Sequence, residues 1–249
     1  MSTVMPLEPA RPSRLRPVVD RVLPGVARVR AQKEPFAAAW RAANEAALGG
    51  QGPLWVALGD SMTQGIGAAG ISGGWVSQLQ RRLAARGHPF RLVNLSVTGA
   101  RVQDVVDDQL PRLQALGVTP DLVTVLIGAN DMFPRRRRAP AVGQYAALLD
   151  ALPAGRSIVA PLPQRNDPAL AINALISRAA ARGQVRVAGF PRTSLRELFG
   201  TLAEDHFHPN ERGYASIAAA FGRAIEAGRD QVAAGPVVKD PGPSERSGH

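Results

Sequence analysis

The chain has 249 residues, of which 45% are hydrophobic, and a formal net charge of +10 at pH 7. This length and apolar content allow one domain with extensions, or two small domains, around a buried core. The sequence contains no cysteine, which excludes disulfides, thiolate zinc sites and a cysteine nucleophile. It also lacks an apolar run of about 18 residues, which argues against a membrane-spanning helix.

Residues 1–50 hold eight basic and four acidic side chains and are predicted to form a basic helical extension. Five valines recur there at helical spacing: Val18, Val19, Val22, Val26 and Val29. We expect a break at Pro24-Gly25, followed by an Ala-rich helix with Phe36, Trp40 and Leu48 on one side. Such an extension either packs on the main domain or makes weak contact with an acidic membrane surface; packing is favoured, because an apolar stripe is more often a packing face.

Strands alternate with helices over the main domain, predicted at residues 51–228. The expected strands are short apolar or β-branched runs: 54–58, 91–96, 122–127, 157–160 and 185–188. Helical patterns lie between and after them, near 75–85, 102–116, 141–152, 168–182 and 209–227. This alternation predicts an α/β fold with a five-stranded parallel sheet covered by helices on both faces. The Pro-, Gly- and Ser-rich residues 229–249 are expected to be a disordered tail.

Polar groups follow the first three strands, at the carboxyl ends where parallel sheets place their sites. They are Gly59-Asp60-Ser61, Asn94 to Gly99, and Gly128-Ala129-Asn130-Asp131. A fourth polar stretch, Asp205-His206-Phe207-His208-Pro209, comes before the last helix. A serine becomes nucleophilic when a base takes its proton and a third group orients that base.

Ser61 is the candidate nucleophile, and the histidine is expected to come from the fourth stretch. Asp205 and His208 are three residues apart, so one turn would bring the carboxylate against Nδ1 and leave Nε2 free for Ser61. His206 is expected to point elsewhere, and Pro209 is expected to begin the last helix.

The four stretches together resemble the SGNH/GDSL hydrolase family over about residues 53–227. The resemblance implies a three-layer α/β/α flavodoxin-like fold and a serine esterase or lipase that needs no cofactor. It implies Ser61, Asp205 and His208 as catalytic residues. The oxyanion would be bound by the Ser61 and Gly99 backbone N–H groups and the Asn130 side chain. One departure from the family motif is Met62 where leucine is usual, a change that roughly conserves volume.

Three further residues are expected to support this site. Asp60 is interpreted as a local hydrogen-bonding brace beside Ser61, and Asp131 as a group that orders the turn after strand three. Gly128 is expected to permit that turn. Asp60 and Asp131 each compete with Asp205 as the acid of the triad, although neither has a histidine nearby in sequence.

The alternative functions receive less support. Gly65-Ile66-Gly67-Ala68-Ala69-Gly70 fits the dinucleotide pattern G-x-G-x-x-G, but it follows the strand too late and no acidic residue ends strand two. We expect instead a flexible glycine-rich loop that leaves room for substrate. The Arg135 to Arg138 run is interpreted as a solvated loop rather than a site for anionic substrates.

The remaining expectations concern partners and location. Nucleic-acid binding is not expected, since aromatic side chains do not accompany the positive charge, and no metal site is expected, because His206 and His208 lack further ligands. We expect a cytoplasmic protein acting on a small-molecule or lipid ester. An acetyl-sugar O-deacetylase or an acyltransferase with the same site is an alternative, as is a non-catalytic module that binds lipid or a partner.

Overall fold

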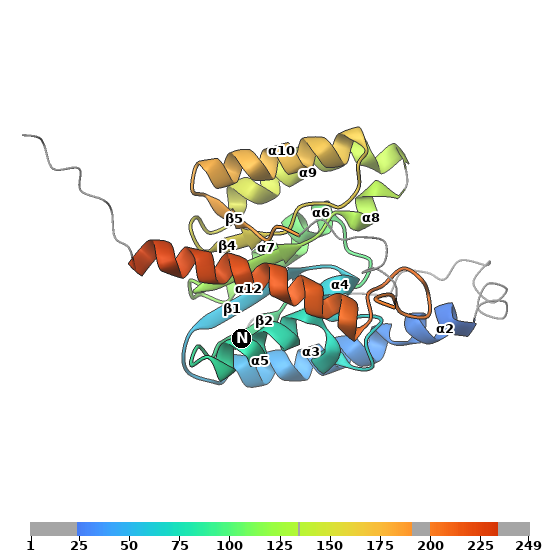
Figure 1. Cartoon of the computed structure of the whole chain (residues 1–249), viewed down its shortest axis with the longest axis horizontal. Helices are drawn as coiled ribbons and strands as arrows, with labels where there is room; N and C mark the ends of the chain where they lie inside the picture. The colour runs from blue at the N-terminus through green and yellow to red at the C-terminus, as the bar shows by residue number, and fades with distance from the viewer. Residues whose placement is uncertain (1–23, 134, 191–199, 234–249) are drawn as a thin grey trace, which may run out of the picture.

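Five parallel strands form a single sheet in the computed structural model, which describes residues 24–133, 135–190 and 200–233 (Figure 1). In the order β2-β1-β3-β4-β5 they are Arg91–Asn94, Leu54–Gly59, Leu122–Leu126, Ser157–Val159 and Val185–Val187. This order and the parallel pairing are those of flavodoxin-like folds. The predicted α/β fold is therefore confirmed. Val18, Val19, Val22 and residues 234–249 lie outside the described part of the chain. The disordered tail expected from residue 229 is wrong for residues 229–233, because the last helix extends to Ala233.

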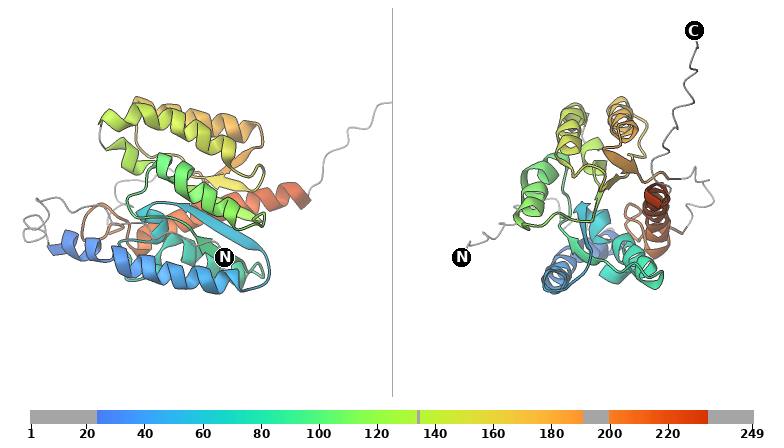
Figure 2. Two further views of the ribbon diagram at one scale, coloured as in Figure 1. Left: turned by 180° about the vertical axis from the view of Figure 1, so that it is seen from behind. Right: turned by 90° about the vertical axis from the view of Figure 1, so that its left-hand side faces the viewer.

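Helices cover both faces of the sheet, which gives the expected three layers (Figure 2). One face carries α6 (Val102–Asp104), a π-helical turn (Val105–Gln109), α7 (Leu110–Ala115), α9 (Arg135–Ala151) and α10 (Asp167–Ala181). The opposite face carries α5 (Trp75–Ala85) and α12 (Glu211–Ala233). On that face Trp75 stacks on Phe221 with ring centroids 4.2 Å apart. The layers hold the carboxyl ends of the strands in a fixed arrangement.

The N-terminal helices α2 (Pro24–Ala31) and α3 (Lys33–Leu48) pack on this domain (Figure 1). Phe36 and Trp40 are buried as expected, but Leu48 is 47% exposed and does not share their face. Helix α2 begins at Pro24, where the sequence predicts an interruption of the helical run, and the residues before Pro24 lie outside the described part of the chain. Proline is well suited to the first helical position, where its missing N–H would have no partner.

Two other helix boundaries differ from expectation. The arginine run is not a loop, because α9 begins at Arg135 rather than at Ala141; arginine is a good helix former, and Arg138 Nε also donates to the Met132 carbonyl at 2.6 Å. Helix α12 begins at Glu211 instead of Pro209. Asn210 Oδ1 accepts the N–H groups of Arg212 and Gly213 and so caps the helix there.

None of the helices within the described ranges is long and apolar enough to cross a bilayer.

Candidate active site

Ser61 is the first residue of the short helix α4 (Ser61–Gln64), which directly follows β1. Asp60 caps this helix, since its Oδ1 accepts the Met62 N–H at 2.9 Å. The turn before the serine is tight: a Cβ at Gly59 would lie 2.4 Å from the Leu126 carbonyl oxygen, and its φ is +151°. The serine is thereby held at the end of the strand with 5% of its surface exposed.

The loop before α12 brings His208 to Ser61. His208 Nε2 lies 2.9 Å from Ser61 Oγ, and Nδ1 lies 2.5 Å from Asp205 Oδ2. The other carboxylate oxygen of Asp205 accepts the N–H groups of Phe207 and His208 at 3.1 and 3.0 Å. The three side chains thus form the hydrogen-bonded series that was expected from the sequence.

Burial raises the pKa of Asp205, but the hydrogen bonds that it accepts from His208 and Phe207 outweigh burial. The pKa of this carboxyl group therefore lies below its usual value. The ionised form is the one that accepts three hydrogen bonds and orients the imidazole. His206 does not take part: it is exposed and adopts a φ of 55°, the left-handed region.

The glycine-rich loop packs against this histidine, and its residue Ile66 also lines a pocket beside His208. A Cβ at Gly67 would lie 2.5 Å from the Pro209 carbonyl oxygen and 2.9 Å from His208 Cβ. The neighbouring Ile66 is buried, and its carbonyl accepts the Tyr214 hydroxyl at 2.6 Å. The loop therefore packs directly against His208, and its flexibility stays a prediction.

The expected oxyanion-binding residues lie at the carboxyl ends of β1, β2 and β3, around the switch point of the sheet. Gly99 is exposed, adopts a φ of +84° and has open space where a Cβ would be. Asn130 Nδ2 donates to the Ala100 carbonyl at 2.9 Å and lies 3.4 Å from Asp60 Oδ2. Within the described ranges, no hydrogen bond uses the backbone N–H of Ser61 or Gly99.

The supporting residues occupy the floor of this site. Asp60 and Asp131 are each 2% exposed. Burial raises the pKa of Asp60 to about 7. The backbone hydrogen bond from Met62 lowers this pKa in part, and the nearby charge of Asp131 raises it further. Burial also raises the pKa of Asp131, whose Oδ2 accepts the Val102 N–H at 3.2 Å. Gly128 adopts a φ of +110° before α8 (Ala129–Met132), as the turn requires.

Sequence reasoning missed two amide side chains that hold the strand ends, one buried and one half-buried. Gln109 donates to the Gly59 carbonyl and accepts the Gly59 N–H, each at 2.8 Å. Asn44 pairs in the same way with the backbone of Asn94, at 2.8 and 2.7 Å. Gln109 follows Val102 and Val105 on the buried stripe of its helical segment. A polar residue in such a stripe is the signal that would have found it.

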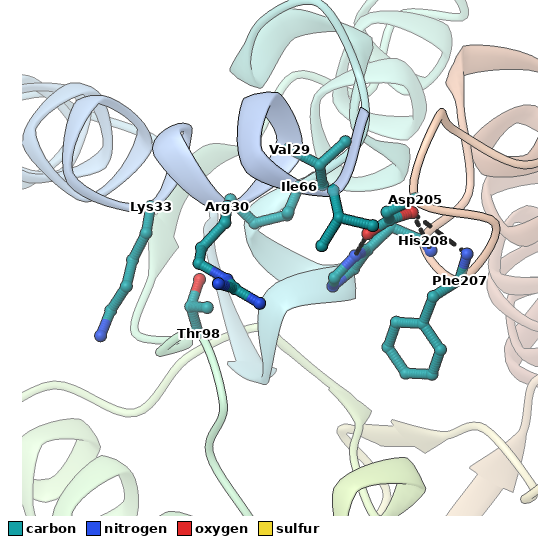
Figure 3. Close-up of a pocket in the computed structure, with 9 residues that line it drawn as sticks. Val29, Arg30, Lys33, Ile66, Thr98, Asp205, Phe207 and His208 are labelled. Carbon is teal, nitrogen blue, oxygen red and sulfur yellow. Dashed lines mark hydrogen bonds and ion pairs between the residues drawn. The ribbon is translucent and has the colours of Figure 1, made fainter. Parts of the chain in front are cut away.

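A pocket of about 300 Å³ opens beside His208. Figure 3 shows residues of α2 and the start of α3 on one side of it and Asp205, Phe207 and His208 on the other. The lining residues are Val26, Val29, Arg30, Lys33, Ile66, Thr98, Asp205, Phe207 and His208. In the described part of the chain, no cluster of three or more His, Cys, Asp or Glu side chains is arranged to hold a metal ion.

A serine, histidine and aspartate in series, at the switch point of a flavodoxin-like sheet, are the arrangement of a serine hydrolase. The chain belongs to the GDSL-like lipase/acylhydrolase family, whose sequence model matches residues 57–216. It is 41% identical over 86 residues to esterase TesA of Pseudomonas aeruginosa, an alignment that covers 34% of this chain and 39% of that protein. The match therefore spans less than half of the curated relative.

Solved structures share the fold. The psychrotrophic esterase EstA of a Pseudoalteromonas species has a TM-score of 0.54 at 19% identity, covering 72% of this chain and 100% of that chain. A crystal structure of TesA has a TM-score of 0.57 at 21% identity, covering 70% and 99%. The family 3 carbohydrate esterase of Clostridium thermocellum has a TM-score of 0.53 at 18% identity, covering 72% and 98%.

Proposed function

We propose that this protein hydrolyses carboxylic esters through an acyl-enzyme on Ser61. The observation that carries the proposal is the unbroken series from Ser61 Oγ to His208 Nε2 and from His208 Nδ1 to Asp205. A serine hydroxyl attacks a carbonyl only when a base removes its proton, and this series supplies both the base and the group that fixes its tautomer. Membership of a lipase/acylhydrolase family supports the same chemistry.

In the first half of the reaction, Ser61 Oγ attacks the ester carbonyl and its proton passes to His208 Nε2. The tetrahedral intermediate collapses with loss of the alcohol, which takes that proton. In the second half, water attacks the acyl-enzyme, again giving a proton to His208, and Ser61 leaves as the hydroxyl when the acid is released. Asp205 holds the imidazole throughout and stabilises its charged form.

The negative charge on the intermediate would be bound by three N–H donors. The backbone N–H groups of Ser61 and Gly99 have no protein acceptor within the described ranges, which leaves them available. One Asn130 N–H is used by Ala100, and the other has only the 3.4 Å contact with Asp60. We assign that second N–H to the oxyanion. Losing one such donor typically costs about 10²–10³ in rate.

Four apolar side chains in the pocket lining, Val26, Val29, Ile66 and Phe207, favour an ester with an apolar substituent. An acetyl-sugar deacetylase would use the same three catalytic side chains, and a panel of esters distinguishes the two. Preference for acetylated sugars over aliphatic esters would support the deacetylase.

The triad is tested with a fluorophosphonate probe, which reacts with activated serines. We expect rapid labelling of the unmodified protein and none of Ser61→Ala. His208→Asn should lower kcat/KM by about 10⁴-fold or more. The matched control is His206→Asn, because His206 is two residues away, exposed and in a conformation that asparagine tolerates. Equal labelling of the Ser61→Ala variant, or equal losses in the two histidine variants, would refute the assignment.

A further inference from the structure

We propose that helix α2 is the wall of the substrate pocket that selects chain length, with Val26 and Val29 as the selecting residues. The inference rests on the proposed ester hydrolysis and goes beyond it, because it names the part of the chain that chooses the substrate. It also gives the N-terminal extension a role at the site itself. The group that we expect in this pocket is the aliphatic part of the ester substrate.

The pocket connects α2 to the reacting atoms. Val26 and Val29 line it together with Ile66 and His208, and His208 Nε2 is 2.9 Å from Ser61 Oγ. Ser61 does not itself line this space, so we infer that one arm of an ester bonded there extends past His208 into it. With a volume of about 300 Å³, the pocket is at the small end of ligand sites, so the number of carbons it admits is sensitive to the side chains of its wall.

Helix α2 is fixed against the loop that carries the histidine. Arg28 Nε donates to Glu204 Oε2 at 2.7 Å, and Glu204 directly precedes Asp205. The backbones are close as well, since a Cβ at Gly25 would lie 2.7 Å from the Glu204 carbonyl oxygen. The wall thus has a defined distance from the catalytic side chains.

The other end of α2 is fixed to the glycine-rich loop. Gln32 Nε2 donates to the Ala68 carbonyl at 2.9 Å, and Gln32 Oε1 accepts the Gly67 N–H at 2.8 Å. Val29 itself is buried, in a cluster with Phe36, Ile66 and Ala203. Because both ends of α2 are hydrogen-bonded to the rest of the domain, the helix cannot easily shift when a side chain changes size. Such a substitution therefore changes the volume of the pocket.

The chemistry of the lining identifies the occupant. Val26, Val29 and Ile66 contribute only aliphatic carbon, and Phe207 adds an aromatic ring. The charged groups of α2 and α3, Arg30 and Lys33, are exposed residues at the pocket, and Figure 3 shows the Lys33 side chain directed away from His208. Moving an aliphatic chain from water onto these apolar side chains lowers the free energy.

The test uses the full chain and variants of opposite size. Val26→Phe fills the pocket and Val29→Ala enlarges it, while Ala31→Phe adds the same bulk at an exposed position of α2 outside the lining. Each is assayed with p-nitrophenyl esters from acetyl to octanoyl and with alkyl acetates from methyl to octyl. Thermal unfolding of each variant shows that the fold is retained.

In at least one of the two series, we expect Val26→Phe to lower the ratio of long-chain to shortest-chain kcat/KM by about 10-fold or more. Val29→Ala should raise the same ratio, and Ala31→Phe should leave it unchanged. If Val26→Phe and Val29→Ala keep the ratio of the unmodified protein in both series, the proposal is overturned.

A binding measurement separates this proposal from the proposed hydrolysis. Calorimetric titration of the Ser61→Ala protein with N-methyloctanamide and N-methylacetamide, with and without Val26→Phe, reports on the pocket without any reaction. We expect Val26→Phe to weaken the octanamide by about 10-fold or more. If Val26→Phe leaves the affinity for N-methyloctanamide unchanged, the proposed role of α2 is overturned even if the protein hydrolyses esters. If Val26→Phe weakens octanamide binding but the unmodified protein hydrolyses no ester, the proposed hydrolysis fails and the proposed role of α2 in binding stands.

Discussion

The side chain of Gln109 pairs with both polar backbone groups of Gly59, at 2.8 Å in each direction. Gly59 is the last residue of β1, two positions before Ser61, and Gln109 ends a π-helical turn on the adjacent face of the sheet. The glutamine amide thus adds to the backbone contacts of Gly59, which also pairs with Leu126 of β3 and accepts the Val97 N–H at 3.2 Å. This contact holds the strand end from which the serine projects.

Replacing Gln109 by leucine should lower the stability of the protein. The substitution leaves the Gly59 N–H buried without its partner, which costs about 1–3 kcal/mol, while the Gly59 carbonyl keeps the hydrogen bond from the Val97 N–H at 3.2 Å. The free energy of unfolding in urea measures the loss. Gln103→Leu is the control, because Gln103 lies on the same segment but only bonds the exposed Asp107. Equal losses in the two variants would contradict a specific role for the Gln109 pair.

Replacing Gly59 by alanine should be more damaging than its small size suggests. The new Cβ would lie 2.4 Å from both the Leu126 carbonyl oxygen and Thr63 Oγ1, at a φ that disfavours side chains. Overpacking of this kind costs about 1–3 kcal/mol, with backbone strain in addition. In the control Gly143→Ala, within α9, the added methyl meets nothing within 4 Å, and stability should rise by about 0.5–1 kcal/mol. Urea unfolding of the two variants should therefore shift in opposite directions.

The parts of this molecule that follow from local chemistry could be predicted from the sequence. The five apolar runs became the five strands, because buried parallel strands need apolar side chains on both faces. The pairing of Asp205 with His208 followed from a three-residue spacing that a single turn closes.

The missed features depend on contacts between distant residues. The side-chain amides of Gln109, Asn44 and Gln32 donate to backbone carbonyls that are 50, 50 and 36 positions away in the sequence. No periodic pattern in the sequence marks such pairs. The glycine-rich loop looked flexible in sequence because its packing against Pro209 and His208 exists only in the fold. Two helix boundaries were missed although local chemistry sets them: arginine is a good helix former at the start of α9, and Asn210 caps α12, which begins at Glu211.

Asp205→Asn should greatly reduce kcat while changing the free energy of unfolding little. The asparagine can still accept backbone N–H groups, but its amide favours the wrong imidazole tautomer, an effect that costs on the order of 10⁴ in kcat. Ester hydrolysis at saturating substrate measures it. Asp150→Asn, at an exposed position of α9, removes the same charge and should leave kcat unchanged. A loss of less than about 10-fold in Asp205→Asn would mean that this carboxylate does not orient His208.

Asp60 should make the protein less stable as the pH rises toward neutrality. Burial raises the pKa of this carboxyl group from 3.8 to about 7. Because the folded-state pKa is above the unfolded one, the contribution of Asp60 to stability is complete below about pH 4 and is lost as the pH rises through about 7. The loss is about 4 kcal/mol at most.

Asp60→Asn tests this, since asparagine also caps helices well but does not titrate. The unfolding free energy of the variant minus that of the unmodified protein should increase steadily from pH 4 to pH 7, as measured in urea at each pH. Asp150→Asn, which removes an exposed carboxyl group, should show no such increase. A constant difference for Asp60→Asn across this range would mean that Asp60 is ionised in the folded protein even at low pH. Burial would then be outweighed by the hydrogen bond from Met62 and the nearby Asn130 amide.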